Sequence, residues 1–198
     1  MKKNNRIIII EDELITANSI QELLIEEDYD VMGIATDANK ALLICAQSTE
    51  PPAVAICDVR IKGTTNGIHV AAQLKSLYGC EIVFLTAFSD AKTVEHAFQQ
   101  EPVMYVVKPF NDKQLRVAVQ MAFHKIYRRL NLNLQLNLTS REKQIASMVA
   151  QGLSTKEIAR QLNISDETVK THRRKMLQKN DISSFTKLIF LMSREQQT

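Results

Sequence analysis

Charged and hydroxyl residues stand directly after four short apolar runs in the first half of the chain. Glu11 and Asp12 follow IIII, Asp58 follows AVAIC, Thr86 follows EIVFL, and Lys108 closes the run that begins VMYVV. If these runs are parallel strands of one sheet, their carboxyl ends share one edge, where ligands bind in open α/β sheets. Carboxylates about 4 Å apart repel by on the order of 4 kcal/mol at an effective dielectric near 20. A hard divalent cation relieves that repulsion, so the spacing predicts a Mg²⁺ site with oxygen ligands.

Each of these residues, taken singly, also has a purely structural explanation. A carboxylate after a strand often caps the following helix, and Thr86 could cap the helix after its own strand. Their occurrence together at successive strand ends favours one shared site over several independent caps.

The elements that must position these residues alternate between short apolar runs and segments of helical spacing. The expected strands are 6–10, 29–36, 53–57, 81–85 and 103–107, and the expected helices are 13–27, 38–47, 67–77, 90–99 and 112–127. Parallel strands need crossover connections, and continuous apolar strands are typical of a sheet buried on both faces. The pattern therefore predicts an α/β fold with a doubly wound five-stranded parallel sheet.

Four motifs in this part of the chain, IIIIEDE, AICDV, FLTA and VVKPF, occur in that order. Together they resemble the receiver domain of two-component response regulators over about residues 4–125, which implies a flavodoxin-like fold. The resemblance implies that Asp58 accepts a phosphoryl group from a sensor histidine kinase. The implied groups around Mg²⁺ are Glu11, Asp12, Asp58 and the main-chain carbonyl of Arg60. The implied switch residues, which respond to the phosphoryl group, are Thr86, Tyr105 and Lys108.

The loop after Asp58 departs from the receiver pattern. It runs DVRIKGTTNG, with Lys62 where proline is common and with Gly67 one residue later than the receiver pattern places its glycine. We expect this lengthening to alter the lip of the pocket, and with it the phosphoryl lifetime and the choice of kinase, while the chemistry is kept.

Composition and charge restrict the class of protein. The chain has 198 residues, 45% apolar and 24% charged, which is typical of globular domains and excludes a disordered chain. Residues 1–123 hold 11 basic and 16 acidic residues, whereas residues 124–198 hold 14 and 6. An acidic first part and a basic second part predict cations and nucleic acid as their respective partners. The three cysteines lack CxxC spacing and no apolar run is long enough to span a bilayer, so we expect a reduced cytoplasmic protein away from the membrane.

The basic second part carries helix signals only. Thr139 and Glu142 form a capping-box pattern, and Ser154 and Ser165 precede two further helical segments. The expected helices are 139–150, 155–161, 166–179 and a final segment that opens at Ser183 or Ser184. The segments 155–161 and 166–179 meet at a tight corner, which predicts a helix-turn-helix.

The second of those segments is rich in basic residues. A basic amphipathic helix can also be a solvated face or a membrane-surface helix, but the paired helix favours DNA. The motifs LTSRE, GLSTKEIARQL and ISDETVKTH resemble the LuxR-type helix-turn-helix over about residues 137–197. The resemblance implies major-groove contacts from Lys170, Thr171 and Arg174, and phosphate contacts from Thr168, His172, Arg173, Lys175 and Lys156. It implies a core role for Ile158, Ala159, Leu162, Ile164 and Val169. Arg174 and Lys170 could each read a base or clamp a phosphate.

The domain assignment follows from the change in pattern and charge. We expect a receiver domain at 1–125, a linker at 126–137 and a small all-α helix-turn-helix domain at 138–198. Residues 131–138, NLNLQLNL, alternate strictly and are predicted to form either an extended strand or a linker whose leucines lie on a neighbouring surface, with dimer contacts as one possible role.

Together these features predict a transcriptional regulator of the NarL/FixJ type, phosphorylated on Asp58, that binds double-stranded DNA as a homodimer. It is expected to be no enzyme beyond phosphoryl acceptance and slow self-dephosphorylation. One alternative is a DNA-binding regulator whose receiver acts without phosphorylation. Another is an aspartyl-phosphate phosphohydrolase, although dehalogenase-like phosphatases need a second aspartate where this chain has Arg60.

Overall fold

The computed structural model describes residues 5–63, 65–87, 101–130, 135–182 and 184–195. Contacts divide the chain into two compact units, one up to Phe123 and the other from His124 onward. Each unit has its own hydrophobic core and its own chemistry, so each is described separately.

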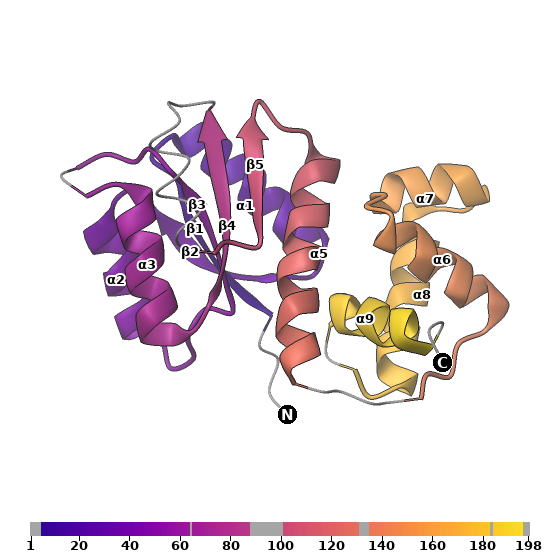
Figure 1. Ribbon diagram of the computed structural model, residues 1–198. Coiled ribbons are helices and arrows are strands. Elements are labelled where there is room, and N and C mark those ends of the chain that lie inside the picture. Colours follow the sequence, from indigo (N-terminus) through magenta and orange to yellow (C-terminus); the bar gives the residue numbers. More distant parts are fainter. Residues whose placement is uncertain (1–4, 64, 88–100, 131–134, 183, 196–198) are drawn as a thin grey trace. The chain divides into compact units, whose positions relative to one another are not determined.

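The first unit is built on a five-stranded parallel sheet in the order β2-β1-β3-β4-β5 (Figure 1). The strands are β1 Arg6–Ile10, β2 Asp30–Ala35, β3 Val54–Asp58, β4 Glu81–Ala87 and β5 Met104–Lys108. The central strands β1, β3 and β4 are almost entirely buried, which explains their runs of β-branched and apolar residues. The expected doubly wound α/β fold is confirmed.

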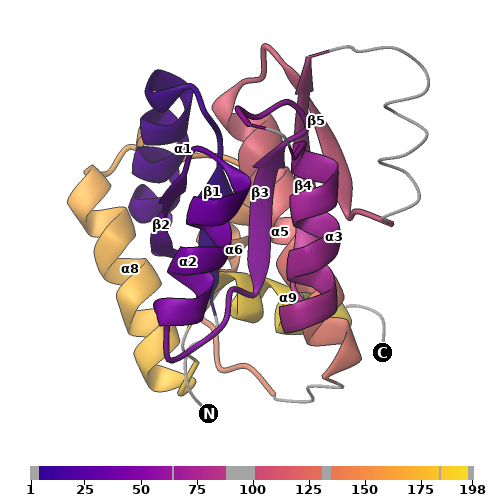
Figure 2. The ribbon, with the colours of Figure 1, turned by 90° about the vertical axis from the view of Figure 1, so that its left-hand side faces the viewer.

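Helices cover both faces of the sheet. They are α1 Leu14–Glu26, α2 Ala38–Gln47, α3 Gly67–Tyr78 and α5 Asp112–Arg129. Figures 1 and 2 show α2 and α3 on one face, with α1 and α5 on the other. The expected helix 90–99 lies outside the described residues.

Alternation along the strands assigns each face its core. Ile8 and Ile10 of β1, Cys57 of β3 and Phe84 of β4 belong to the core that α2 and α3 cover. The intervening residues point to the opposite face, because successive side chains of a strand alternate. On that second face Phe123 of α5 stacks on Tyr29, with ring centroids 5.3 Å apart.

The start of α3 packs directly on the end of β3. Asn66 caps the helix by accepting a hydrogen bond from the backbone N–H of His69, and the N–H of Gly67 donates to the carbonyl of Val59. A Cβ atom at Gly67 would lie 1.8 Å from the carbonyl oxygen of Asp58. Only glycine permits this approach. The lengthened loop is accommodated before Gly67, and it includes Gly63 at φ +111°.

The second unit consists of helices and contains the expected helix-turn-helix. Its helices are α6 Ser140–Ala150, α7 Thr155–Leu162, α8 Asp166–Lys179 and α9 Phe185–Glu195. Thr139 and Ser154 close the capping boxes of α6 and α7, and Ser165 caps α8. Asn163 ends α7 in the left-handed conformation (φ 53°), which asparagine tolerates better than most residues, and so turns the chain within three residues.

The last turns of α5 also belong to the core of this second unit. Tyr127 is buried, its ring centroid lies 5.9 Å from that of Phe190, and its hydroxyl is hydrogen-bonded to Ser184 at 2.9 Å. The ring of His124 contacts Phe190 edge-on at 5.0 Å. The first residues of the predicted linker 126–137 are therefore helical and packed, because α5 supplies an aromatic side chain that α9 buries.

The alternating segment NLNLQLNL is described only in part. Residues 131–134 lie outside the described residues, and 135–138 form neither helix nor strand. Asn137 is nevertheless fixed, since its N–H donates to the side chain of Asn180 at 2.7 Å. In the part of the chain that the structure covers, no helix combines the length and the apolar character required to cross a membrane.

Candidate functional site

Three carboxylates meet at the carboxyl edge of the sheet. Glu11 follows β1, Asp12 is its neighbour, and Asp58 ends β3, which pairs in parallel with β1. One oxygen from each lies within 4.8 Å of the others. Glu11 and Asp58 are buried and Asp12 is half-buried, so the cluster opens to solvent on the side of Asp12.

Lys108 joins this cluster from the end of β5. Its Nζ donates to Glu11 Oε2 at 2.6 Å and to Asp58 Oδ2 at 2.5 Å. Charge-assisted hydrogen bonds of this kind are shorter and stronger than neutral ones. The ammonium therefore holds two carboxylates that are 47 residues apart in sequence in one arrangement, with β4 and β5 paired in parallel beside them.

Burial and pairing oppose each other in this cluster. Burial raises the pKa of Glu11 above its usual value; the hydrogen bond from Lys108 offsets only part of this effect, and the charge of Asp58 adds to it. For Lys108 burial alone would lower the pKa, but the hydrogen bonds to Asp58 and Glu11 outweigh burial and raise it. The lysine is therefore charged at neutral pH and serves as a fixed counterion.

The second oxygen of Asp58 is held by the backbone. The N–H of Arg60 donates to Asp58 Oδ1 at 2.9 Å, so both carboxylate oxygens have fixed partners. The side chain of Arg60 itself is exposed.

The donor set suits a hard divalent cation. All three side chains supply oxygen, their oxygens are close enough to share one ion, and two of the three are shielded from water. A cation here would also relieve the mutual repulsion of the carboxylates, which the single half-buried Lys108 only partly neutralises. Glu11, Asp12 and Asp58 therefore form a site that could hold a metal ion.

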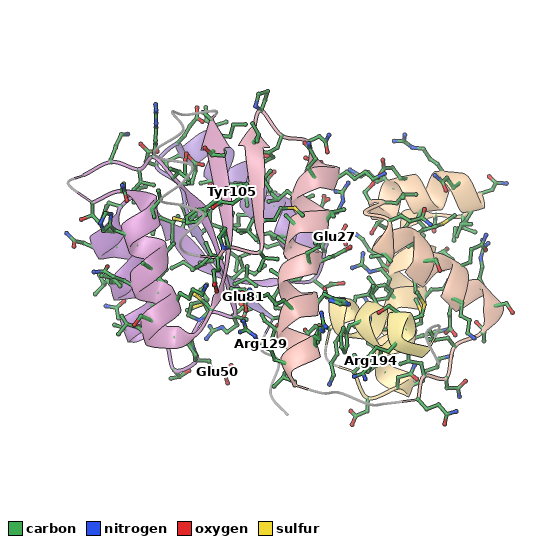
Figure 3. The ribbon with its side chains drawn as sticks, in the orientation of Figure 1. Glu27, Glu50, Glu81, Tyr105, Arg129 and Arg194 are labelled. Atoms are coloured by element: carbon green, nitrogen blue, oxygen red, sulfur yellow. The ribbon has the colours of Figure 1, made fainter. Side chains whose placement is uncertain are left out.

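The two expected switch residues lie on β4 and β5. Thr86 is buried, and its hydroxyl donates to the carbonyl of Ala87 at 3.0 Å. Tyr105, labelled in Figure 3, belongs to β5, and its ring stacks on Phe84 with centroids 5.7 Å apart. Burial raises the pKa of the Tyr105 phenol to about 12, so the ring is neutral at physiological pH.

A second lysine at this site was not expected from the sequence. Lys62 Nζ lies 3.9 Å from Asp12 Oδ2, and its side chain is 78% exposed. The available signal was its place, four residues after Asp58 in a loop at the same edge of the sheet. The departure from the receiver pattern at this position thus adds a charge to the acidic cluster.

The second unit presents basic side chains on α8 and at the start of α7. Lys170 and Arg174 are exposed and four residues apart, hence on one face of α8. Thr171, Thr168 and His172 are half-buried, whereas Lys175 and Lys156 are exposed. Of the expected core residues, Ile158, Ala159 and Val169 are buried, and Leu162 and Ile164 are half-buried.

Arg173 differs from the expectation that it faces the phosphates. It is only 3% exposed, its guanidinium lies over the ring of Phe185 at 4.8 Å, and it donates to Thr155 Oγ1 at 3.3 Å. The helical spacing indicates the reason, because Val169, Arg173 and Met176 fall on one inward stripe and all three are buried. Arg173 ties α8 to α7 and α9 and is not available to DNA in this conformation.

A partly buried ion pair links α6 to α8 in the second unit. Glu142, the acidic partner in the capping box of α6, accepts from Lys179 Nζ at 2.5 Å and from the N–H of Thr139 at 2.8 Å. Burial would raise the pKa of Glu142, but the hydrogen bonds from Lys179 and Thr139 outweigh it and lower the pKa below its usual value. This pair joins the start of α6 to the end of α8.

Two family models match the chain, one over each unit. The model described as "Response regulator receiver domain" matches residues 7–120, and the one described as "Bacterial regulatory proteins, luxR family" matches residues 136–192. The first covers more than half of the chain, and the two together leave only the termini and a short connection outside.

Relatives with the same two-part organisation match over nearly their whole length. The transcriptional regulatory protein DesR of Bacillus subtilis (strain 168) is 30% identical over 185 residues, covering 90% of this chain and 91% of DesR. The transcriptional regulatory protein LiaR of the same organism is 27% identical, covering 91% and 93%. The solved structure of the response regulator StyR is 25% identical and covers 96% of this chain and 98% of its own, with a TM-score of 0.51. With an acidic cluster at the end of a parallel sheet and a basic helix-turn-helix later in the sequence, the chain belongs to the family of two-component response regulators that join a receiver domain to a LuxR-type DNA-binding domain.

Proposed function

We propose that this protein is a phosphorylation-dependent transcriptional regulator that accepts a phosphoryl group on Asp58 from a sensor histidine kinase. The observation that carries the proposal is the Lys108 ammonium, hydrogen-bonded to both Glu11 and Asp58 beside Asp12. Such a cluster provides a nucleophilic carboxylate, a fixed cation and oxygen ligands for a metal within one small space. Phosphoryl transfer depends mainly on positioning and on neutralising charge, and these groups supply both.

The metal in this proposal is Mg²⁺, held by Glu11, Asp12, Asp58 and the main-chain carbonyl of Arg60. When bound, it supplies charge that neutralises the oxygens of the transferring phosphoryl group. The protein's own contribution is orientation: the Arg60 N–H fixes one oxygen of Asp58, and Lys108 fixes the other. In the transfer, an oxygen of Asp58 forms a bond to phosphorus while the bond from phosphorus to the kinase histidine nitrogen breaks, and the histidine leaves with the electron pair of that bond.

Two rearrangements would then follow on the side of β4 and β5. The Thr86 hydroxyl leaves the carbonyl of Ala87 and donates to a phosphoryl oxygen, which is a stronger, charged acceptor. Lys108 exchanges one of its carboxylate bonds for another phosphoryl oxygen. Tyr105, which already stacks on Phe84 and is paired with it across β4 and β5, follows Thr86, which lies two residues beyond Phe84 on β4. These movements are the proposed switch.

The output of the switch is DNA binding by α8. The second unit carries a large excess of basic residues, and Lys170, Arg174, Lys175 and Lys156 are exposed there. Thr171 would lie with Lys170 and Arg174 in the major groove, and Thr168 and His172 beside Lys175 and Lys156 near the phosphates. Since one helix-turn-helix reads one half-site, a homodimer on a twofold-symmetric double-stranded site is proposed for the active state. The proposed location is the cytoplasm.

The experiment is phosphorylation of the full-length chain by acetyl phosphate with Mg²⁺, followed by intact mass spectrometry and sedimentation. The wild-type protein should gain one phosphoryl group and become dimeric, whereas Asp58→Asn should do neither. Thr86→Ala serves as the matched control: it should gain the phosphoryl group normally but fail to dimerise. Labelling that persists in Asp58→Asn contradicts the assignment of the acceptor. Absence of labelling in the wild type, with DNA binding intact, favours a receiver that acts without phosphorylation.

A further inference from the structure

The loop after Asp58 places a second ammonium group at the acidic cluster. Lys62 Nζ lies 3.9 Å from Asp12 Oδ2, while Lys108 Nζ is hydrogen-bonded to Glu11 and Asp58. Each of the three carboxylates is thus paired with one of two lysines. Asp12 is the most exposed of the three, and its lysine is the exposed one.

This pairing changes the charge that a metal ion would meet. Three carboxylates with Lys108 alone carry a formal charge of −2, and Lys62 reduces this to −1 when its ammonium is beside Asp12. A divalent cation that uses Asp12 must approach the place where this ammonium lies. Two cations on one carboxylate repel each other, even where water screens them. Occupation of Asp12 by the metal and by Lys62 is therefore competitive.

The surroundings allow the Lys62 side chain to move away from Asp12. Its side chain is 78% exposed, and the next residue, Gly63, has φ +111° with no atom within 4 Å of the position of a Cβ. Lys62 also lines a surface hollow of about 410 Å³, together with Asp37 of the loop before α2. An ammonium displaced from Asp12 thus has water and another carboxylate available within the same hollow. Lys108 lacks this freedom, because its side chain is only 20% exposed between two carboxylates.

We propose that Lys62 is a tethered counterion that competes with Mg²⁺ for Asp12 and thereby sets the metal affinity of the receiver. The inference rests on the proposed metal site and adds the residue that tunes it. An intracellular Mg²⁺ concentration that saturates a site without this lysine then saturates the site of this protein less completely. The residue acts by position and charge, and it takes no part in bond formation.

The test is a titration of the full-length protein with MgCl₂ at low ionic strength, followed by the amide NMR signals of Asp12 and Arg60. Lys62→Met should bind Mg²⁺ about two- to five-fold more tightly than wild type, the range expected for an exposed ion pair. Lys62→Arg, which keeps the charge, should stay near the wild-type affinity. The gain should shrink as ionic strength rises, because exposed charges are screened by salt.

Lys75→Met is the matched control. Lys75 pairs with Glu101 at 4.0 Å, nearly the separation of Lys62 and Asp12, but it lies in the last turn of α3, at the end away from Asp58. Its removal changes the net charge equally and should leave the Mg²⁺ affinity unchanged. If Lys62→Met binds Mg²⁺ like the wild type, or if Lys75→Met gains as much, the inference about Lys62 is overturned while the metal site stands. If neither the wild type nor any variant binds Mg²⁺, both the inference and the proposed metal site are overturned.

Discussion

Replacing Gly67 with alanine tests how closely the start of α3 must approach Asp58. The added Cβ would lie 1.8 Å from the Asp58 carbonyl oxygen, 2.9 Å from its carbonyl carbon and 3.0 Å from the sulfur of Cys57. Two of these three atoms belong to the backbone of β3, which is buried and paired on both sides. No rotation of a side chain relieves the contact, so α3 or the end of β3 must move by roughly 1 Å.

The cost can be estimated from the packing. Overpacking in a filled core costs about 1–3 kcal/mol, and a backbone obstacle places Gly67→Ala toward the upper end. Alanine recovers about 0.4–1 kcal/mol by restricting the unfolded chain. The net loss is about 2 kcal/mol, which corresponds to a Tm lower by roughly 6–10 °C for a unit of this size. The displacement also moves the Asp58 carbonyl and the Arg60 N–H, so phosphoryl acceptance should fall with stability.

Gly79→Ala, at the other end of α3, separates a clash from simple backbone strain. Gly79 has φ +66°, and no atom lies within 4 Å of the position of a Cβ there. Its replacement should cost about 1 kcal/mol through the left-handed conformation alone. Thermal unfolding and acetyl phosphate labelling of both variants provide the comparison. A Gly67→Ala protein with wild-type Tm and wild-type labelling would refute the close approach of α3 to Asp58.

Three further predictions concern the second unit. Tyr127→Ala should destabilise the second unit by about 3–5 kcal/mol because a buried ring is lost, whereas Tyr127→Phe should cost only about 1 kcal/mol for the lost hydrogen bond. Chemical denaturation followed by circular dichroism measures both losses, and equal losses would contradict the packing of the ring. Because the pKa of Glu142 is lowered in the folded state, its pair with Lys179 stabilises the fold above pH 4.5, and this stability is lost as pH falls through the lowered pKa. The free energies of unfolding of wild type and Glu142→Gln, measured across pH 3–7, should therefore become equal at the acidic end. Arg174→Ala should weaken DNA binding by about 1–3 kcal/mol at unchanged Tm, whereas Arg173→Met should lower Tm. If Arg173→Met loses DNA affinity without a lower Tm, Arg173 contacts DNA after all.

The architecture of the first unit was predictable because local patterns are unambiguous there. Short β-branched runs such as residues 6–10 cannot bury two faces unless helices cover both, and that requirement leads to the doubly wound sheet. The parallel order then sends Glu11, Asp58 and Lys108 to one edge, so their meeting follows from topology without knowledge of any distance. Capping patterns at Thr139 and Ser154 were equally reliable, since they depend on contacts only three residues apart.

The same reasoning could not predict contacts that depend on the direction in which a long side chain extends. Arg173 is of a residue type that often contacts DNA, but it occupies a helical position that faces the core. Only its contacts with Phe185 and Thr155 show that it is a core residue. Tyr127 ends a helix that the pattern predicts, but its packing in the core of the second unit could not be predicted, because its partner Phe190 lies far along the chain.

The amino-acid sequence is sufficient to predict the order of the elements, the edge at which the acidic residues gather and the basic character of the second unit. These depend on periodicity, caps and charge, which act over a few residues or follow from strand order. The folded structure is needed to show that Gly67 lets α3 pack against the Asp58 carbonyl and that Lys108 binds two of the carboxylates. It also decided that Lys62 reaches the third, Asp12. The physical reason is that these are distances between atoms brought together by the folded sheet, and a loop of given sequence can direct a lysine toward solvent or toward a carboxylate.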